Sequence, residues 1–382
     1  MFLGVQYLRG LAALLVAYYH LFGYDIAEPL SALEGGAFGV DIFFVVSGFV
    51  MWVTTDRDDA SPSAFLRRRI VRVVPLYWLF TALLVLVALA APGLAPRIDL
   101  SWDQLVKSLL FIPHSAPAAP GDFNHPILSQ GWTLNYEIFF YGLFAASLLL
   151  RTPWRRLAIM AATFLALVAA GRWLSPAHPV LAVYTDPILL EFLLGMAIGG
   201  ARRELGRLGA GAGVVLVAGG ACLVVDHGFL HPSSLNRLLA FGPGSALLVA
   251  GAVALEPWTA RRGMRLLASL GDASYALYLS HSFTIKAAMV LLAKVAPIML
   301  PLVGVWLYAG LAATAALLAA TTVAVLIHRH LERPLTEAAK AAWAARFMAE
   351  GLQRWRETRR RLGEAPRSVA GDRLGWRARG DP

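Results

Sequence analysis

The stretch VQYLRGLAALLVAYYHLFGYD, residues 5–25, places an arginine and a histidine in a segment that is otherwise apolar enough to cross a bilayer. A charged side chain at membrane depth costs at least about 2.5 kcal/mol, so it indicates a function or a specific partner. Arg9 and His20 are eleven residues apart. That spacing is about 1100° of helical rotation, or three turns plus about 20°, and about 16 Å along the axis. The stretch therefore predicts a transmembrane helix with a cation and a titratable base on one face.

Composition extends this prediction to the whole chain. Of 382 residues, 58% are hydrophobic and 15% are charged, and many apolar runs approach the length that spans a membrane. The single cysteine, Cys222, excludes a disulfide framework and a cysteine zinc cluster. The formal net charge of +10 could suggest nucleic acid as a partner. Its basic residues, however, lie in short loops and in the C-terminal tail, so we predict no nucleic-acid partner.

Apolar runs of spanning length predict an all-α polytopic membrane protein, a bundle of about ten transmembrane helices. The predicted spans lie near residues 4–23, 37–55, 73–91, 132–150, 155–173, 186–201, 208–226, 235–255, 270–293 and 301–328. No internal repeat is evident in these runs.

The loops between these runs alternate in charge. Basic residues gather on one side, among them Arg67, Arg68, Arg155, Arg156, Arg202, Arg203, Arg261, Arg262 and Arg265. The opposite side carries few, among them Lys107, Arg172 and Arg237. By the positive-inside rule the first side is cytoplasmic, and an even number of spans puts both termini there. An alternative reading of the first span is a cleaved signal peptide, but Arg9 and the segment VAYYHLF do not fit one.

The chain changes character after Leu335. Basic side chains alternate with Trp343, Phe347, Leu352 and Trp355, a pattern typical of an amphipathic helix on an anionic membrane surface. We therefore predict two parts: a transmembrane domain over residues 1–335, and a basic, partly disordered cytoplasmic tail over residues 336–382.

Polar residues inside the predicted spans fall at compatible depths and predict one polar shaft, cationic at its cytoplasmic end. Its members are His20, Asp41, Glu137 and Glu191 near the outer surface, Tyr275, Tyr278 and His281 at mid-depth, and Arg9, Arg68, Arg69 and Arg72 toward the cytoplasm. Arg69 and Arg72 share a helical face at a spacing of three residues. No spacing typical of metal ligands and no nucleophilic serine motif occurs, so we predict neither a metal nor a bound cofactor.

Each of these residues also has a structural alternative. Arg9 can extend its guanidinium to the inner interface, and Asp41 and Glu137 can cap the outer ends of their helices. His281 can be a hydrogen-bonded bundle residue, and the run RRRIVR (67–72) orients the chain with or without another role. Their joint occurrence at matching depths favours a functional site over separate structural roles.

Six motifs, in order along residues 5 to about 330, resemble the membrane acyltransferase family 3. This family comprises integral-membrane O-acyltransferases that modify bacterial surface polysaccharides, peptidoglycan and some secondary metabolites. The motifs are RGLAALLVAYYH, GVDIFFVVSGF, RRRIVRVVPLYW, WTLNYEIFFY, EFLLGMAIG and GDASYALYLSH. One departure is Asn135-Tyr136 before Glu137, where many members have a small residue and a second acid. No fused extracytoplasmic hydrolase-like domain is expected, which favours a polysaccharide, glycolipid or small-metabolite hydroxyl as acceptor over peptidoglycan.

The resemblance implies transfer from cytoplasmic acyl-CoA, with acetyl-CoA the default, to an extracytoplasmic hydroxyl. Arg69 and Arg72, with Arg68, would pair with the phosphates of the donor, and Arg9 would hold its pantetheine arm or stabilise developing negative charge. His20, hydrogen-bonded to a carboxylate such as Glu137, would act as the general base. Asp41, Glu191, Tyr275, Tyr278 and His281 would line the shaft or contact the acceptor.

Two other classes remain open on the sequence alone. A proton-coupled transporter of a small anion or sugar would also place arginine, histidine and glutamate in a polar shaft, but the chain lacks the repeat symmetry typical of many transporters. A non-enzymatic membrane protein would need none of these buried charges. The acyltransferase interpretation implies a multi-pass protein of the bacterial cytoplasmic (inner) membrane, with lipid, acyl-CoA and a carbohydrate or related acceptor as partners.

Overall fold

The computed structural model falls into two units, Met1–Leu335 and Thr336–Pro382. It describes residues 2–33, 35–55, 61–94, 98–116, 124–150, 152–226 and 234–345. In the second unit the described residues, 336–345, are helical, and Lys340 Nζ donates to Glu337 Oε1 at 2.9 Å. Residues 346–382 of the tail predicted over 336–382 lie outside the described residues.

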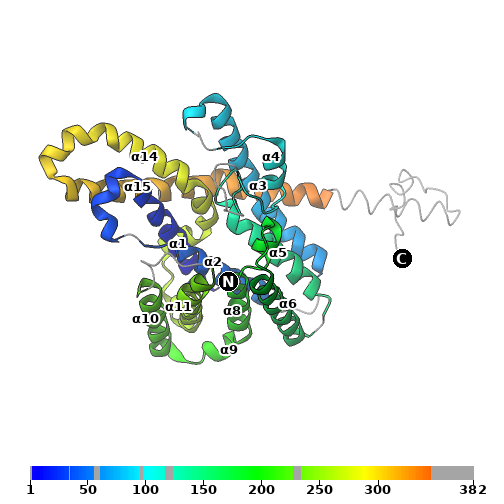
Figure 1. Ribbon diagram of the computed structural model, residues 1–382. Coiled ribbons are helices and arrows are strands. Elements are labelled where there is room, and N and C mark those ends of the chain that lie inside the picture. The colour runs from blue at the N-terminus through cyan, green and yellow to red at the C-terminus, as the bar shows by residue number, and fades with distance from the viewer. Residues whose placement is uncertain are drawn as a thin grey trace, which may run out of the picture. The chain divides into compact units, whose positions relative to one another are not determined.

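Every regular element in these described ranges is a helix (Figure 1). The longer helices are α1 (Leu3–Tyr19), α2 (Gly39–Thr54), α3 (Pro62–Ala90), α5 (Gly131–Ser147), α6 (Pro153–Leu174), α8 (Leu189–Gly200), α10 (Gly209–Asp226), α11 (Ser234–Ala254), α14 (Ser274–Val303) and α15 (Val305–Ile327). Short helices connect them: α4 (Trp102–Leu109), α7 (Pro179–Tyr184), α9 (Arg202–Leu205), α12 (Glu256–Arg262) and α13 (Arg265–Asp272). The all-α prediction is confirmed for the described part of the chain.

Six of the described helices are long and apolar enough to cross a membrane. They are Pro62–Ala90, Pro153–Leu174, Pro179–Gly200, Leu235–Ala254, Ser274–Val303 and Val305–Ala345. Two more apolar helices, Gly39–Thr54 and Gly209–Val224, are shorter. The helices that carry Arg9 and Glu137 have 17 residues each. The six long apolar helices indicate a membrane-embedded protein. The ten membrane crossings and the cytoplasmic location of both termini stay predictions.

The arginine run of residues 67–72 lies inside a helix and not in a loop. α3 starts at the N-cap Ser61, whose Oγ accepts from the backbone N–H of Ala64, and Pro62 occupies the first turn. Proline suits that position because its missing N–H would have no helical partner there. Helical geometry therefore fixes the directions of Arg69 and Arg72, which both contribute to the cavity described below.

Helices α2 and α8 meet through two glycines. A Cβ added at Gly48 would lie 2.0 Å from the carbonyl oxygen of Phe192, and one added at Gly195 would lie 1.9 Å from that of Val45. Small residues allow such close backbone contact between membrane helices, where packing replaces the hydrophobic driving force. We call this contact, made by Gly48 and Gly195, the glycine seam.

We expect Gly195→Ala to destabilise the protein, because the added methyl group cannot fit without moving α2 away from α8. Overpacking of this kind costs about 1–3 kcal/mol, so the melting temperature in detergent should fall by several degrees. Gly142→Ala on α5 is the matched control, since its Cβ would meet nothing within 4 Å. Equal melting temperatures for the two variants would contradict the close contact at the seam.

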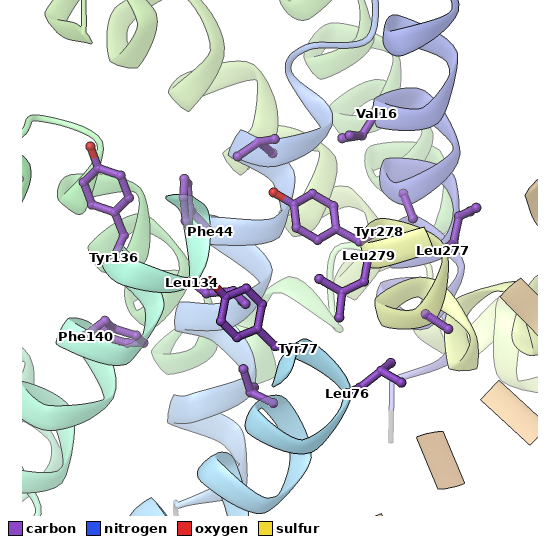
Figure 2. Packing of buried hydrophobic residues seen from close by; sticks show 14 of the residues in the cluster. Val16, Phe44, Leu76, Tyr77, Leu134, Tyr136, Phe140, Leu277, Tyr278 and Leu279 are labelled. Carbon is purple, nitrogen blue, oxygen red and sulfur yellow. The ribbon is translucent and has the colours of Figure 1, made fainter. Parts of the chain in front are cut away.

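One core cluster of the first unit includes aromatic and aliphatic side chains from α1, α2, α3, α5 and α14 (Figure 2), together with others from α6, α8 and α15. Phe44, Tyr77, Phe140 and Tyr278 are among its larger members, and each is less than 9% exposed. Large aromatic rings bury much surface, and a buried tyrosine hydroxyl usually has a hydrogen-bond partner. Tyr77 follows this rule, since its hydroxyl donates to the Ser108 carbonyl at 3.2 Å.

Large apolar side chains on the outer faces of the helices are exposed. Trp173 on α6 is 87% exposed, and α14 and α15, which run side by side (Figure 1), expose Leu302 and Trp306. Apolar surface of this extent is unfavourable in water and favourable against lipid tails. The outer faces therefore fit the bilayer, and the polar chemistry lies among the inner faces.

Candidate active site

One cavity lies among α1, α2, α3, α5 and α14, and polar side chains from all five helices reach it. Its polar lining consists of Arg9, Ser47, Arg69, Arg72, Thr133, Glu137, Tyr141, Ser274, Tyr275 and Tyr278. Six residues predicted for the shaft are thus brought together: Arg9, Arg69, Arg72, Glu137, Tyr275 and Tyr278. Three arginines face one glutamate, so the lining carries excess positive charge and favours an anionic ligand.

Arg9 is held in the cavity by neutral groups. Its two terminal nitrogens donate to Gln6 Oε1 at 3.2 Å and to Ser274 Oγ at 3.0 Å, and Gln6 in turn donates to Asp272 at 2.5 Å. No ion pair joins Arg9 to a carboxylate among the residues that the structure describes. These contacts fix the guanidinium while leaving its charge available to a ligand, and they do not fit a side chain that merely extends to the interface.

Arg69 and Arg72 project from the same face of α3 into the cavity. Arg69 is buried, donates to Thr54 Oγ1 at 3.0 Å and packs its guanidinium 5.6 Å from the centre of the Phe65 ring. Its buried Nε has no hydrogen-bond partner in the described part of the chain, and a donor left unpaired in this way is costly unless a ligand or water fills the position. Arg68 differs from both because it is exposed and does not line the cavity.

Glu137 accepts hydrogen bonds from Ser47 Oγ, at 3.1 Å, and from the hydroxyl of Tyr141. The predicted hydrogen bond between His20 and Glu137 is not found among the described residues, and this prediction is corrected. His20 Nδ1 instead lies 2.8 Å from the Val16 carbonyl oxygen, one helical turn back. That carbonyl can only accept, so Nδ1 carries the hydrogen and Nε2 keeps its lone pair. The backbone, and not Glu137, selects the tautomer.

His20 is exposed at the end of α1, where a 3-10 turn (His20–Gly23) follows the helix. It does not line the cavity, but its ring packs against His281 with the ring centres 4.8 Å apart. His281 is fully buried, and its ring centre lies 6.1 Å from that of Tyr278, which does line the cavity. The rings of two residues, His281 and Tyr278, therefore connect the exposed histidine to the cavity.

The two tyrosines of α14 are tied to different neighbours. Tyr275 donates from its hydroxyl to the Val73 carbonyl of α3 at 2.7 Å. The Tyr278 hydroxyl lies 2.8 Å from Thr133 Oγ1 and 3.2 Å from the Gln130 carbonyl, at the start of α5. These bonds hold α14 against α3 and α5 on two sides of the cavity.

Asp41 and Glu191 lie apart from the cavity, so the predicted single shaft is divided. Asp41 is fully buried and pairs with Arg237 of α11, whose Nη2 and Nε approach the carboxylate to 2.6 and 3.0 Å. Arg237 also donates to the Ala37 carbonyl at 3.1 Å. Glu191 is fully buried beside this pair. Two carboxylates and one arginine thus link α2, α8 and α11.

Several contributors were missed by sequence reasoning. Arg237 was counted as a loop cation, and nothing in its neighbourhood in the chain indicates Asp41 as its partner. Gln6, Ser47 and Ser274 are neutral polar residues in the stretches quoted above and gave no signal of their own. Tyr141 could have been found, since it lies four residues after Glu137 on α5 and therefore on the same helical face.

No group of three or more potential metal-binding side chains occurs in the part of the chain that the structure describes. The residues described above are arginines, a hydroxyl-bound carboxylate, tyrosines and a histidine pair.

Comparison with known proteins identifies the family. A family model described as an acyltransferase domain matches residues 2–329. The exopolysaccharide production protein ExoZ of Rhizobium meliloti (strain 1021) is 39% identical over 311 residues, which cover 80% of this chain and 91% of ExoZ. The acyltransferase MdmB of Streptomyces mycarofaciens is 30% identical over 278 residues, which cover 66% of this chain and 68% of MdmB.

No solved structure matches the chain significantly. The matched residues include all six motifs and every residue that lines the cavity. The chain belongs to this family of membrane acyltransferases.

Proposed function

We propose that this protein is an O-acyltransferase that moves an acyl group, acetyl by expectation, from cytoplasmic acyl-CoA to a hydroxyl group outside the bacterial inner membrane. The observation that carries the proposal is the arginine-lined cavity, which the Tyr278 and His281 rings connect to the exposed His20. The family assignment supports a transferase and leaves the transporter interpretation without support.

The donor is expected to enter from the arginine end of the cavity. Coenzyme A is polyanionic at its nucleotide end, and arginine binds phosphate through paired, charge-assisted hydrogen bonds. Arg72 and the unpaired Nε of Arg69 supply donors for such contacts. Because Arg68 is exposed, we expect it to attract the anionic donor electrostatically before binding, and not to contact the donor in the bound complex.

Arg9 would bind the pantetheine arm and not the reacting carbonyl. Eleven residues of helix separate its backbone from that of His20, a rise of about 16 Å, which is longer than an arginine side chain. A thioester placed for attack near His20 would lie beyond the reach of the Arg9 guanidinium. Of the two roles implied for Arg9, the structure therefore favours holding the donor.

His20 would act as the general base. Its Nε2 takes the proton of the acceptor hydroxyl while that oxygen attacks the thioester carbon, and the new C–O bond forms as the C–S bond breaks. The leaving thiolate then receives the proton from Nε2, which gives free coenzyme A and restores His20. The Val16 carbonyl bonded to Nδ1 keeps the ring in the required tautomer throughout.

The acceptor is proposed to be a carbohydrate. A glycolipid or a small metabolite would offer the same reactive group, a hydroxyl. The likeness to a protein named for exopolysaccharide production supports the carbohydrate. Residues 1–335 would hold the whole catalytic apparatus, and the basic tail would lie on the cytoplasmic membrane surface.

The proposal is tested by incubating the purified protein with acetyl-CoA labelled in the acetyl group, with and without surface glycan from the producing cell. We expect release of coenzyme A and appearance of label in the glycan. Label that stays in acetyl-CoA, with no binding of coenzyme A to the protein, would reject the proposed reaction.

We expect Arg69→Ala and Arg72→Ala each to raise the KM for acyl-CoA about tenfold or more, since a hydrogen bond to a charged group contributes about 1.5–3 kcal/mol. The KM for the acceptor should stay near the wild-type value. Arg155→Ala is the control, because Arg155 is exposed and outside the cavity. Unchanged donor affinity in both variants would remove the phosphate-binding role.

Orientation can be checked with cysteines introduced after replacement of Cys222. Cysteine at Ser61, on the predicted cytoplasmic side, should react only with reagents that cross the membrane. Cysteine at Ala177, exposed after α6 on the predicted outer side, should react with impermeant reagents in intact cells. The reverse pattern would overturn the assignment of donor and acceptor sides.

A further inference from the structure

His281 is a buried imidazole whose hydrogen bonding is incomplete. Its Nδ1 lies 3.2 Å from the Leu277 carbonyl oxygen, an acceptor, so Nδ1 carries the ring hydrogen and Nε2 presents a lone pair. That Nε2 is buried and has no hydrogen-bond partner among the residues that the structure describes. Buried polar atoms nearly always have a partner, so an exception calls for an explanation.

The ring that packs against His281 is that of the proposed base, His20. Two rings pack on His20, that of Tyr19 at 5.4 Å and that of His281 at 4.8 Å between ring centres. His20 and His281 hold their Nδ1 hydrogens in the same way, each on the carbonyl four residues earlier. In the neutral rings both histidines therefore keep an Nε2 lone pair.

We propose that His281 is a positioning residue for acyl transfer, whose Nε2 accepts a hydrogen bond from His20 after His20 has taken the proton of the acceptor hydroxyl. The inference rests on the proposed function of His20. The proton moves from the acceptor oxygen to His20 Nε2, is held there by the His281 lone pair, and passes to the leaving thiolate. His281 itself stays neutral, which suits its full burial.

The difference in burial between the two histidines decides which of them can be the base and which the positioning residue. His20 is exposed and open to an acceptor, whereas His281 has no exposed surface and cannot meet one. The Leu277 carbonyl fixes the tautomer of His281 before the reaction, so the ring needs no tautomer change when positive charge develops on His20, and such preorganised groups are effective in catalysis.

The test compares His281→Phe, which keeps a ring of similar size but has no acceptor, with His281→Gln, which keeps an acceptor oxygen. We expect His281→Phe to lower kcat about ten- to hundredfold, the range for a hydrogen bond to a charged group, with an unchanged KM for acyl-CoA. His281→Gln should retain more of kcat. A wild-type kcat in His281→Phe would overturn the proposal.

A second readout does not depend on acyl transfer. Diethyl pyrocarbonate modifies the unprotonated Nε2 of histidine, so the rate of modification of His20 reports whether a proton is held there. At mildly acidic pH we expect His20 to react several-fold faster in His281→Phe than in the wild type, while the exposed His178 reacts equally in both. Equal rates at His20 would overturn the pairing. Absence of acyl transfer in the wild type would reject the proposed function, and the modification rates would still decide the pairing.

Discussion

His20→Ala is expected to lower acyl transfer by about 100- to 10,000-fold, the range contributed by a general acid or base. The structure leaves its Nε2 free, because Nδ1 is bonded to the Val16 carbonyl. The loss should appear in kcat, since the arginines that would bind the donor lie on other parts of the site. Binding of coenzyme A and the melting temperature should therefore match those of the wild type.

The matched control is His178→Ala, which removes another exposed histidine before α7. It should keep wild-type turnover. His20→Gln tests the alternative that His20 only fills a hydrogen-bonding position in the bundle, because an amide keeps donor and acceptor but cannot take a proton at neutral pH. Near-normal turnover of His20→Gln would show that the residue is not the base.

Arg9→Ala should lower kcat/KM for acyl-CoA up to about 150-fold, the upper end for loss of a charge-assisted hydrogen bond. Arg9→Lys should still lose about tenfold, because an ammonium keeps the charge but not the planar fork. In the structure that fork contacts Gln6 and Ser274 at the same time. A titration of the variants with coenzyme A measures the effect directly.

The control is Arg262→Lys, an exposed arginine that stacks 4.6 Å from the centre of the Trp258 ring and lies outside the cavity. Its turnover should not change. If Arg9 only extended to the inner interface, lysine would serve equally well, and Arg9→Lys would bind coenzyme A as the wild type does.

Much of the fold followed from the sequence because bilayer thickness and helical geometry are local constraints. An apolar run has to be helical in lipid, since every backbone group must find a partner within its own segment. Arg9 and Glu137 could also be selected in advance, because a charge within an apolar run has few structural explanations. Arg69 and Arg72 lie outside the predicted span 73–91 and could be selected by their shared helical face. The structure brings these four together in one cavity.

What the sequence could not supply is which helical faces meet. Asp41 and Glu137 have the same depth in their predicted spans, yet Asp41 pairs with Arg237 and only Glu137 lines the cavity. Depth along a helix is set by local sequence, whereas rotation about its axis is set by packing against other helices. The choice of Val16, and not Glu137, as the partner of His20 is a second case, since a backbone carbonyl leaves no trace in the side-chain pattern.

The glycine seam has a consequence for how new specificities can arise on this scaffold. Seven residues of α2 line the cavity, from Val40 to Met51, and α2 is locked to α8 through Gly48 and Gly195. This wall cannot retreat to admit a bulkier acyl chain. Two other lining helices, α3 and α14, are joined by the hydrogen bond from Tyr275 to Val73. We therefore expect tolerance for longer acyl chains to evolve, or to be engineered, through smaller side chains on α3 and α14, while the position of α2 stays unchanged.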